Sequence, residues 1–399
     1  MDSTMSTSTR PLGIINSSVE GVLGLHEATL RGATDYVAQA LARRAAPLDL
    51  WSDLMTWVQT MNDRQPPQWA TDHTVVAEWP IARLRDFSTA DAPEMTPTLF
   101  LPPQAGHDSC IVDYDPAQSQ VGTALRAGLS RVLSLDWVGA TQATKNSSIE
   151  DYVTVIAEAI ASVGGRVHLV GDCQGGWLAV IYAALYPESV ETLTIAGAPI
   201  DFHAGEPLIH DWMQVLSPGR DLAFYRAMVR SNNGILPGEL LLTGFIAMQP
   251  HVELDRQLQL LAHQHEPDHV ERYRKFDAWF HHCQPIPGAF YLWIVEHLFQ
   301  NNELIAGTLR VGERTVDLGQ ISCPLHLLAG KTDHITPPPQ VFALADFVGT
   351  SPADVTNSTT TGGHLGLFMG HEALQEHWLP QFEKLAARAV QQPVALAGD

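Results

Sequence analysis

The fold of this chain is decided at residues 167–180, which read VHLVGDCQGGWLAV. An apolar, β-prone run enters a GDCQG turn, and a helix-compatible run follows it as far as Pro187. This order of strand, turn and helix is the context of the Gly-x-Ser-x-Gly nucleophile elbow, with Cys173 at the serine position. Because the turn is sharp, the neighbours of Cys173 must lack bulk for strand and helix to approach each other. The stretch predicts Cys173 as a nucleophile, against the alternative of a small buried core residue.

Outward from this turn, short apolar segments alternate with helical ones. We expect strands at residues 74–79, 82–87, 98–103, 131–137, 167–172, 192–197, 321–330 and 355–358. A helix is expected over 148–163, because Ser147 or Ser148 can cap its start and glycines at 164 and 165 end it. The alternation predicts an α/β fold whose mostly parallel central sheet carries helices on both faces.

The alternation is interrupted by a long insertion. Residues 201–307 read as mostly helical with no clear strand, which predicts a cap over the nucleophile, with a plain second helical layer as the alternative. The predicted organisation is a tail and helices at 1–70, core at 71–200, cap at 201–307, core at 308–390 and a tail at 391–399.

Composition excludes several classes of protein. The 399 residues carry 23 basic and 44 acidic side chains, a net charge of −21, and phosphate binding by a nucleic-acid partner would need the opposite sign. The 4 cysteines are scattered and form no Cys-x-x-Cys pair, so a reducing cytoplasm is expected. The N-terminus lacks an apolar signal core, and no apolar run approaches the ~18 residues of a membrane span, so we expect no transmembrane segment.

Two further residues complete a catalytic constellation. Asp333 follows a late strand and His364 follows the last one, and Cys, Asp, His is the nucleophile, acid and base order of the α/β-hydrolase fold. His364 would deprotonate the Cys173 thiol, and Asp333 would hold the imidazole tautomer. Asp333 could instead be an aspartate that stabilises a turn or caps a helix, and His364 could be a hydrogen-bonded loop histidine. His334 is an alternative candidate for the catalytic histidine.

An oxyanion hole is expected from two backbone segments. The amide of Gln174 would point into the site at the helix N-terminus, and the second donor would be the amide of Gln104 or Ala105, in the loop after the third strand. Substrate contacts are expected from three neighbours of the triad: Trp177, His334 and Asp172. Asp172 would disfavour a thiolate on Cys173 if its carboxylate faced the site.

Histidines are frequent in the insertion, at 203, 210, 251, 263, 265, 269, 281, 282 and 297. Their spacing matches no zinc motif, and His263 and His265 lack further ligands nearby. We therefore expect neither a metal nor a cofactor.

A series of motifs carries a family resemblance. The series is LPP (101–103), LDW (135–137), GDCQGG (171–176), PG (287–288), NEL (302–304), VDL (316–318), ISCP (321–324), GKTDHITP (330–337) and GHLG (363–366). In this order the motifs resemble those of polyhydroxyalkanoate synthases over roughly residues 70–385. The resemblance implies a triad on Cys173, Asp333 and His364 and transfer of 3-hydroxyacyl groups from coenzyme A thioesters to a growing polyester. It also implies a homodimer and association with a polyester granule.

The sequence departs from that family at several positions. Asp172 replaces the apolar or aromatic residue usual beside the nucleophile, the N-terminal region is shorter, and the histidine motif continues as LFMG (367–370). These changes keep two alternatives open on the same fold. One is a thiol hydrolase of hydroxyacyl esters or thioesters, acting as a depolymerase or thioesterase. The other is a non-catalytic protein that binds polyester granules.

Overall fold

The computed structural model of the chain describes residues 11–89, 95–205 and 221–391, together with 209, 212, 213 and 217. The predicted tails at 1–10 and 391–399 lie outside these residues, apart from residue 391. The chain divides into two compact units, a helical unit of residues 1–67 and 239–282 and a sheet unit of residues 68–238 and 283–399.

The sheet unit is built on an eight-stranded sheet in the order β1-β2-β4-β3-β5-β6-β11-β12. Its strands are β1 (Thr74–Trp79), β2 (Ala82–Asp86), β3 (Thr98–Leu101), β4 (Val132–Trp137), β5 (Val167–Asp172), β6 (Val190–Ala196), β11 (Leu325–Gly330) and β12 (Val355–Thr360). β2 pairs antiparallel with both β1 and β4, and the remaining neighbours are parallel. This arrangement confirms the predicted α/β-hydrolase fold with its mostly parallel sheet.

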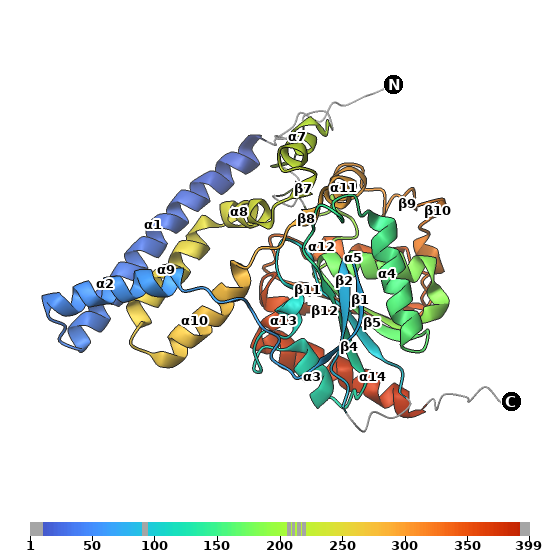
Figure 1. Cartoon of the computed structure of the whole chain (residues 1–399), viewed down its shortest axis with the longest axis horizontal. Helices are drawn as coiled ribbons and strands as arrows, with labels where there is room; N and C mark the ends of the chain where they lie inside the picture. The colour runs from blue at the N-terminus through green and yellow to red at the C-terminus, as the bar shows by residue number, and fades with distance from the viewer. Residues whose placement is uncertain are drawn as a thin grey trace. The chain divides into compact units, whose positions relative to one another are not determined.

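Helices cover both faces of this sheet (Figure 1). They are α3 (Gln120–Arg126), α4 (Ile149–Ser162), α5 (Gln174–Leu185), α12 (Pro338–Phe342), α13 (Gly366–Met369) and α14 (Leu379–Gln391). α4 contacts α5, and α3 contacts α14. Every residue of β3, β4, β5 and β11 is buried, because helices exclude water from both faces of these central strands.

The helix expected at 148–163 is present as α4, one residue shorter at each end, with Ser148 and Val163 as its flanking residues. The helix starts after Ser148, whose backbone N–H donates to the Asp151 carboxylate at 2.8 Å. The helix ends before Gly164 and Gly165, whose φ angles of 118° and 82° lie in the region that favours glycine.

The predicted insertion at 201–307 is divided between the two units. Residues 239–282 group with the N-terminal helices, whereas 201–238 and 283–307 belong to the sheet unit. The expectation of no strand in the insertion is wrong, because β7 (Ile235–Leu236) pairs antiparallel with β8 (Ile286–Pro287). β8 leads into α11 (Gly288–Trp293) and a π-helical turn at Ile294–Gln300. The role of the insertion as a cap stays a prediction.

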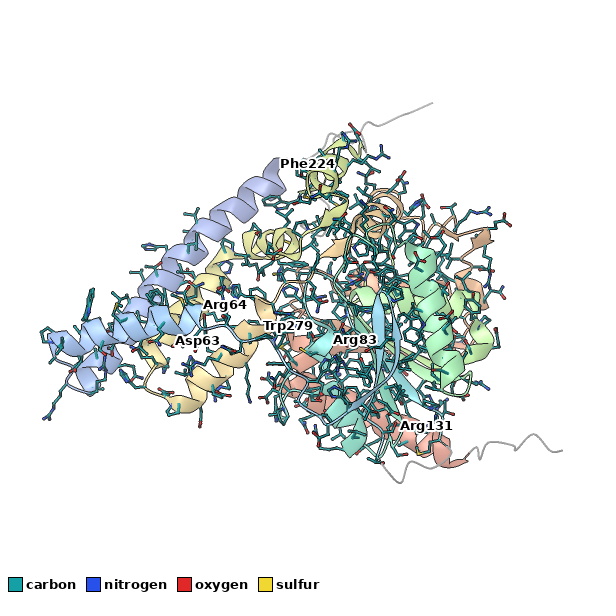
Figure 2. The ribbon with its side chains drawn as sticks, in the orientation of Figure 1. Asp63, Arg64, Arg83, Arg131, Phe224 and Trp279 are labelled. Atoms are coloured by element: carbon teal, nitrogen blue, oxygen red, sulfur yellow. The ribbon has the colours of Figure 1, made fainter. Side chains whose placement is uncertain are left out.

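The helical unit consists of α1 (Pro11–Ala42), α2 (Pro47–Asn62), α9 (Pro250–His263), α10 (Pro267–Phe280) and most of α8 (Gly238–Met248). α1 packs closely on α9, since a Cβ on Gly24 or Gly32 would lie 2.7 Å from His251 or 2.5 Å from Leu258. A second anchor is the buried Asp277, which accepts from Arg64 at 2.9 Å and pairs with Arg256 at 3.0 Å. Figure 2 shows Arg64 just beyond the end of α2.

Among the described residues, none of the helices combines the length and apolar character needed to cross a bilayer.

Candidate active site

Cys173 occupies a strained turn between β5 and α5. Its φ and ψ are 49° and −116°, a left-handed backbone that non-glycine residues rarely adopt. The turn is held at both ends, because the Cys173 N–H donates to the carbonyl of Ala196 at 2.8 Å and its own carbonyl accepts from Gly176 at 2.9 Å. The half-buried Cys173 side chain is therefore fixed at the carboxyl edge of the sheet, as strained nucleophile turns require.

Asp333 and His364 lie at the same edge, after β11 and β12. The His364 Nδ1 and Asp333 Oδ2 atoms are 2.7 Å apart, and both side chains are buried. The other Asp333 oxygen accepts the backbone N–H groups of Ile335 at 2.9 Å and Thr336 at 2.8 Å. The carboxylate is thus held in one orientation and fixes the imidazole ring through Nδ1.

The second ring nitrogen of His364 is available for a hydrogen bond with Cys173. Burial lowers the pKa of His364, but the adjacent Cys173 and Asp333, each hydrogen-bonded to the imidazole, raise it to about 10. Since Nδ1 faces Asp333, the bond to Cys173 uses Nε2. His364 is therefore placed to exchange a proton with the Cys173 thiol, which is the arrangement that a cysteine nucleophile needs. The structure brings together the three residues that the sequence predicted, and their catalytic roles stay predictions.

Two neighbours of His364 were missed from the sequence. The Phe368 ring meets the imidazole edge to face with centroids 5.2 Å apart. Gly197, at the end of β6, has a φ of 56°, and a Cβ there would lie 2.9 Å from Leu367 and 3.4 Å from the His364 ring. The signal for Phe368 was its position one helical turn after His364.

The backbone segments of the expected oxyanion hole meet at the elbow. The Gln174 amide lies at the start of α5, and Gly175 packs against Leu101 and Pro102, where the loop after β3 begins. The Gln104 side chain points into the core, donating to the Val138 carbonyl at 3.2 Å and accepting from the Tyr152 hydroxyl. The choice between the amides of Gln104 and Ala105 stays open, because both follow the segment at the elbow.

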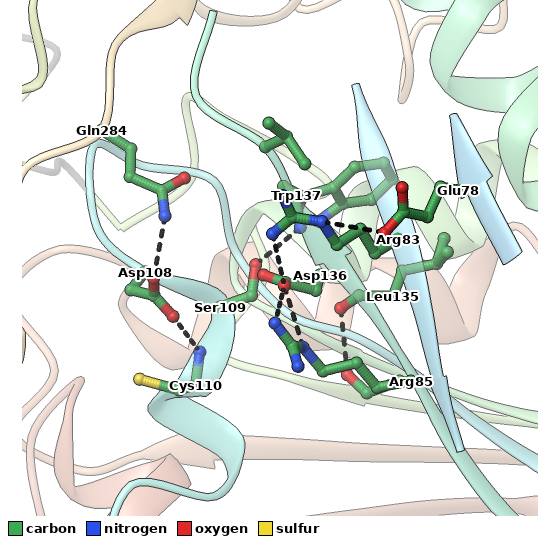
Figure 3. Close-up of polar contacts among 12 residues, drawn as sticks. Glu78, Arg83, Arg85, Asp108, Ser109, Cys110, Leu135, Asp136, Trp137 and Gln284 are labelled. Carbon is green, nitrogen blue, oxygen red and sulfur yellow. Dashed lines mark hydrogen bonds and ion pairs between the residues drawn. The ribbon is translucent and has the colours of Figure 1, made fainter. Parts of the chain in front are cut away.

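The loop after β3 is anchored by a set of polar contacts (Figure 3). Asp108 accepts from the Gln284 side chain at 2.8 Å and from the Cys110 N–H at 2.9 Å. Ser109 Oγ accepts the Trp137 N–H at 2.9 Å, and the Trp137 indole donates to the Pro102 carbonyl at 2.8 Å. These bonds hold the predicted oxyanion segment from both of its ends.

The three expected substrate contacts lie in different surroundings. Trp177 is buried in an aromatic cluster, with its ring centroid 6.1 Å from Phe290 and 6.3 Å from Trp293. His334 is half-buried beside Asp333. Asp172 is buried, and Gln120, a residue missed from the sequence, donates to its Oδ1 at 3.4 Å. Burial raises the pKa of Asp172 to about 8, so its carboxyl is mostly neutral at pH 7. A role for these residues in substrate binding stays a prediction.

No group of three or more potential metal ligands is found in the described part of the chain. Of the insertion histidines, His210 lies outside that part. The four cysteines are free thiols, and Cys110 is fully buried.

Comparison with known proteins adds a family and several relatives. The model of a family described as "Protein of unknown function (DUF3141)" matches residues 77–377. The chain is 27% identical to the poly(3-hydroxyalkanoate) polymerase subunit PhaC of Allochromatium vinosum, over 67% of this chain and 74% of that one. The PhaC subunit of Haloferax mediterranei is 28% identical over 67% of this chain and 54% of its own length. The resemblance seen in the sequence motifs is confirmed, as is the expectation of an enzyme of acyltransferase or hydrolase type.

Solved structures give a weaker likeness. The monoacylglycerol lipase of Paleococcus ferrophilus superposes with a TM-score of 0.48 at 18% identity, covering 77% of this chain and 98% of that one.

Proposed function

We propose that this chain, which belongs to the DUF3141 family, is a cysteine-dependent acyltransferase of the polyhydroxyalkanoate synthase type. It transfers 3-hydroxyacyl groups from coenzyme A thioesters to a polyester chain. The observation that carries the proposal is the thiol of Cys173 on a strained elbow, hydrogen-bonded to a histidine that Asp333 orients at 2.7 Å. The similarity to two PhaC subunits supports the substrate class.

A cysteine suits this reaction because the thioester formed on it is close in free energy to the thioester consumed. In the first step the Cys173 thiolate attacks the acyl carbonyl, the carbon–sulfur bond to coenzyme A breaks, and the leaving thiolate takes a proton from His364. In the second step His364 removes a proton from the 3-hydroxyl of an incoming acyl unit. That oxygen attacks the Cys173 thioester, an ester bond forms, and the proton returns to the cysteine sulfur.

Negative charge develops on the carbonyl oxygen in both steps. The amide of Gln174, at the N-terminus of the twelve-residue helix α5, is the proposed first donor to this oxygen. The amide of Gln104 or Ala105 is the proposed second donor, held by the anchored loop after β3. Each such donor contributes about 2.7–4 kcal/mol of transition-state stabilisation in enzymes of this kind.

The test is incubation of the purified chain with 3-hydroxybutyryl-coenzyme A. Free thiol release is followed together with mass spectrometry of the products, and Cys173→Ala is the control. We expect oligomeric esters, or a hydroxyacyl adduct on Cys173 that passes into oligomers. Full turnover by Cys173→Ala would exclude the mechanism.

Two other outcomes identify the alternatives. Thiol release with only monomeric acid as product would assign a hydrolase, in which water replaces the 3-hydroxyl as the second nucleophile. If no thiol is released and no adduct forms on Cys173, but the chain is retained on polyester granules, the result would assign a non-catalytic granule-binding protein. A homodimer at a polyester granule surface in the cytoplasm belongs to the same proposal, and sedimentation of the chain with and without granules measures both properties.

A further inference from the structure

The elbow carries a second carboxyl that the proposed mechanism does not use. Asp172 is the last residue of β5 and the immediate neighbour of Cys173, and only 1% of its surface is exposed. Its hydrogen bond comes from Gln120 Nε2 at 3.4 Å, which is long for a bond to a charged acceptor. An ionised carboxylate buried with one weak donor would be strongly disfavoured.

Gln120 explains how this carboxyl can be accommodated. The residue begins α3, is fully buried, and its Oε1 has no hydrogen-bond partner among the described residues. A neutral carboxyl pairs with a primary amide through two bonds, accepting N–H on one oxygen and donating O–H from the other. A protonated Asp172 would therefore accept the Gln120 N–H and donate its O–H to the unpartnered Gln120 Oε1. An ionised Asp172 has no proton to donate and would leave Gln120 Oε1 without a hydrogen bond.

The charged groups near this pair are few. The sheet neighbours of the Asp172 end of β5 are Leu101 of β3 and Ala196 of β6, both uncharged, and α13 carries no ionisable residue. On the α3 side the nearest acids along the chain are Asp115, whose Oδ1 accepts from the Ala117 N–H at 2.8 Å, and Asp113. The Asp113 carboxylate accepts from the Thr71 hydroxyl at 2.8 Å and from the Ser119 hydroxyl at 2.6 Å. The Arg126 guanidinium of α3 donates to the Thr123 hydroxyl at 2.8 Å. The charged group that interacts with Asp172 is His364, whose imidazolium favours the Asp172 anion.

We propose that Asp172 is a positioning residue which, as a neutral acid paired with Gln120, leaves the His364 proton free to move, and which on ionising holds that proton on His364. The inference rests on the proposed Cys173 and His364 pair. Burial raises the pKa of Asp172 to about 8, so the change falls just above neutral pH. Acyl transfer should slow above that pH, because His364 must give its proton to the leaving thiolate.

The first measurement is the infrared band of a protonated carboxylic acid, followed from pH 6 to 10 in the whole chain. We expect the band to disappear around pH 8 in the wild type and to be missing at all pH values in Asp172→Asn. Asp113→Asn is the matched control, because it neutralises another buried carboxyl bound to the residue before Gln120, and it should keep the band. A wild-type spectrum without the band at pH 7, or an unchanged band in Asp172→Asn, would overturn the neutral assignment.

The second measurement is the pH dependence of Cys173 alkylation by iodoacetamide, which needs no acyl substrate. We expect the upper inflection, where His364 loses its proton, to fall by about one unit in Asp172→Asn, the size of effect a nearby opposite charge produces. An inflection at the wild-type position would refute the coupling. His364→Gln separates the two proposals, since retention of the upper inflection in that variant would reject the Cys173 and His364 pair itself.

Discussion

A Cβ atom placed on Gly175 would lie 1.8 Å from the carbonyl oxygen of Leu101, at the end of β3. Real Cβ atoms never approach an oxygen this closely, so the first turn of α5 and the end of β3 meet only because residue 175 has no side chain. The same contact brings the loop after β3 to the nucleophile elbow.

Gly175→Ala should therefore disrupt the elbow. We expect the free energy of unfolding to fall by about 3 kcal/mol or more, because the contacted atom belongs to the backbone and the neighbouring strand β3 is buried. Gly244→Ala is the matched control, since nothing lies within 4 Å of its Cβ position in α8. The control should be neutral or stabilising by up to about 1 kcal/mol. Urea denaturation measures both, and equal stability losses would contradict the prediction.

Asp333→Asn should reduce acyl transfer without unfolding the chain. The asparagine amide can replace one oxygen but offers N–H to His364 Nδ1, which selects the wrong imidazole tautomer. We expect kcat to fall by roughly 10³–10⁴-fold while thermal unfolding shifts little. Steady-state thiol release from 3-hydroxybutyryl-coenzyme A gives the rate. A loss of less than tenfold would argue against Asp333 as the orienting acid.

Two buried histidines should make the chain sensitive to acid. Burial lowers the pKa of His168 and of His326 to about 4, against an ordinary value of 6.5. The unfolded chain then binds more protons between pH 6.5 and 4, so stability is full above pH 6.5 and is lost as pH falls. At pH 4.5 each histidine should lower the free energy of unfolding by about 2–3 kcal/mol. Urea denaturation of the wild type and of the double variant His168→Asn/His326→Asn at pH 7 and 4.5 tests this prediction. If both proteins lost the same free energy of unfolding between the two pH values, the two histidines would not be the cause of the acid sensitivity.

The helical unit should depend on the charge of Asp277. This carboxylate is 3% exposed and meets Arg64 at 2.9 Å, Arg256 at 3.0 Å and the His281 ring at 3.0 Å. Burial opposes the charge, but His281 and the arginines hold the pKa of Asp277 well below its usual range. Its stabilisation is present above pH 3.8 and is lost as pH falls below that value. Asp277→Ala should destabilise this unit by about 3–5 kcal/mol, because Arg256 would lose a buried partner.

Hydrogen exchange of residues 250–280 tests the Asp277 prediction within the helical unit. Glu271→Ala is its control, since Glu271 forms a surface pair with Lys275 at 3.8 Å and should change protection very little. Similar loss of protection in the two variants would contradict the assignment.

Local pattern alone determined most of the strands, the capped helix α4 and the elbow at Cys173. Strand 74–79 was predicted with the bounds it has, because alternation and turn residues act over a few positions and need no distant partner. The order of Cys173, Asp333 and His364 was likewise readable along the chain. The short pair of β7 and β8 was not, since two-residue strands carry no periodicity.

Contacts between distant residues were decided by the tertiary structure. The 2.7 Å contact of Asp333 with His364 spans 31 residues, and that of Gln120 with Asp172 spans 52. Whether Asp172 faces the substrate or the interior depends on where α3 begins relative to β5, which no local pattern records. The division of residues 201–307 between two units has the same cause, because burial and long-range packing are summed over the whole chain rather than over one segment.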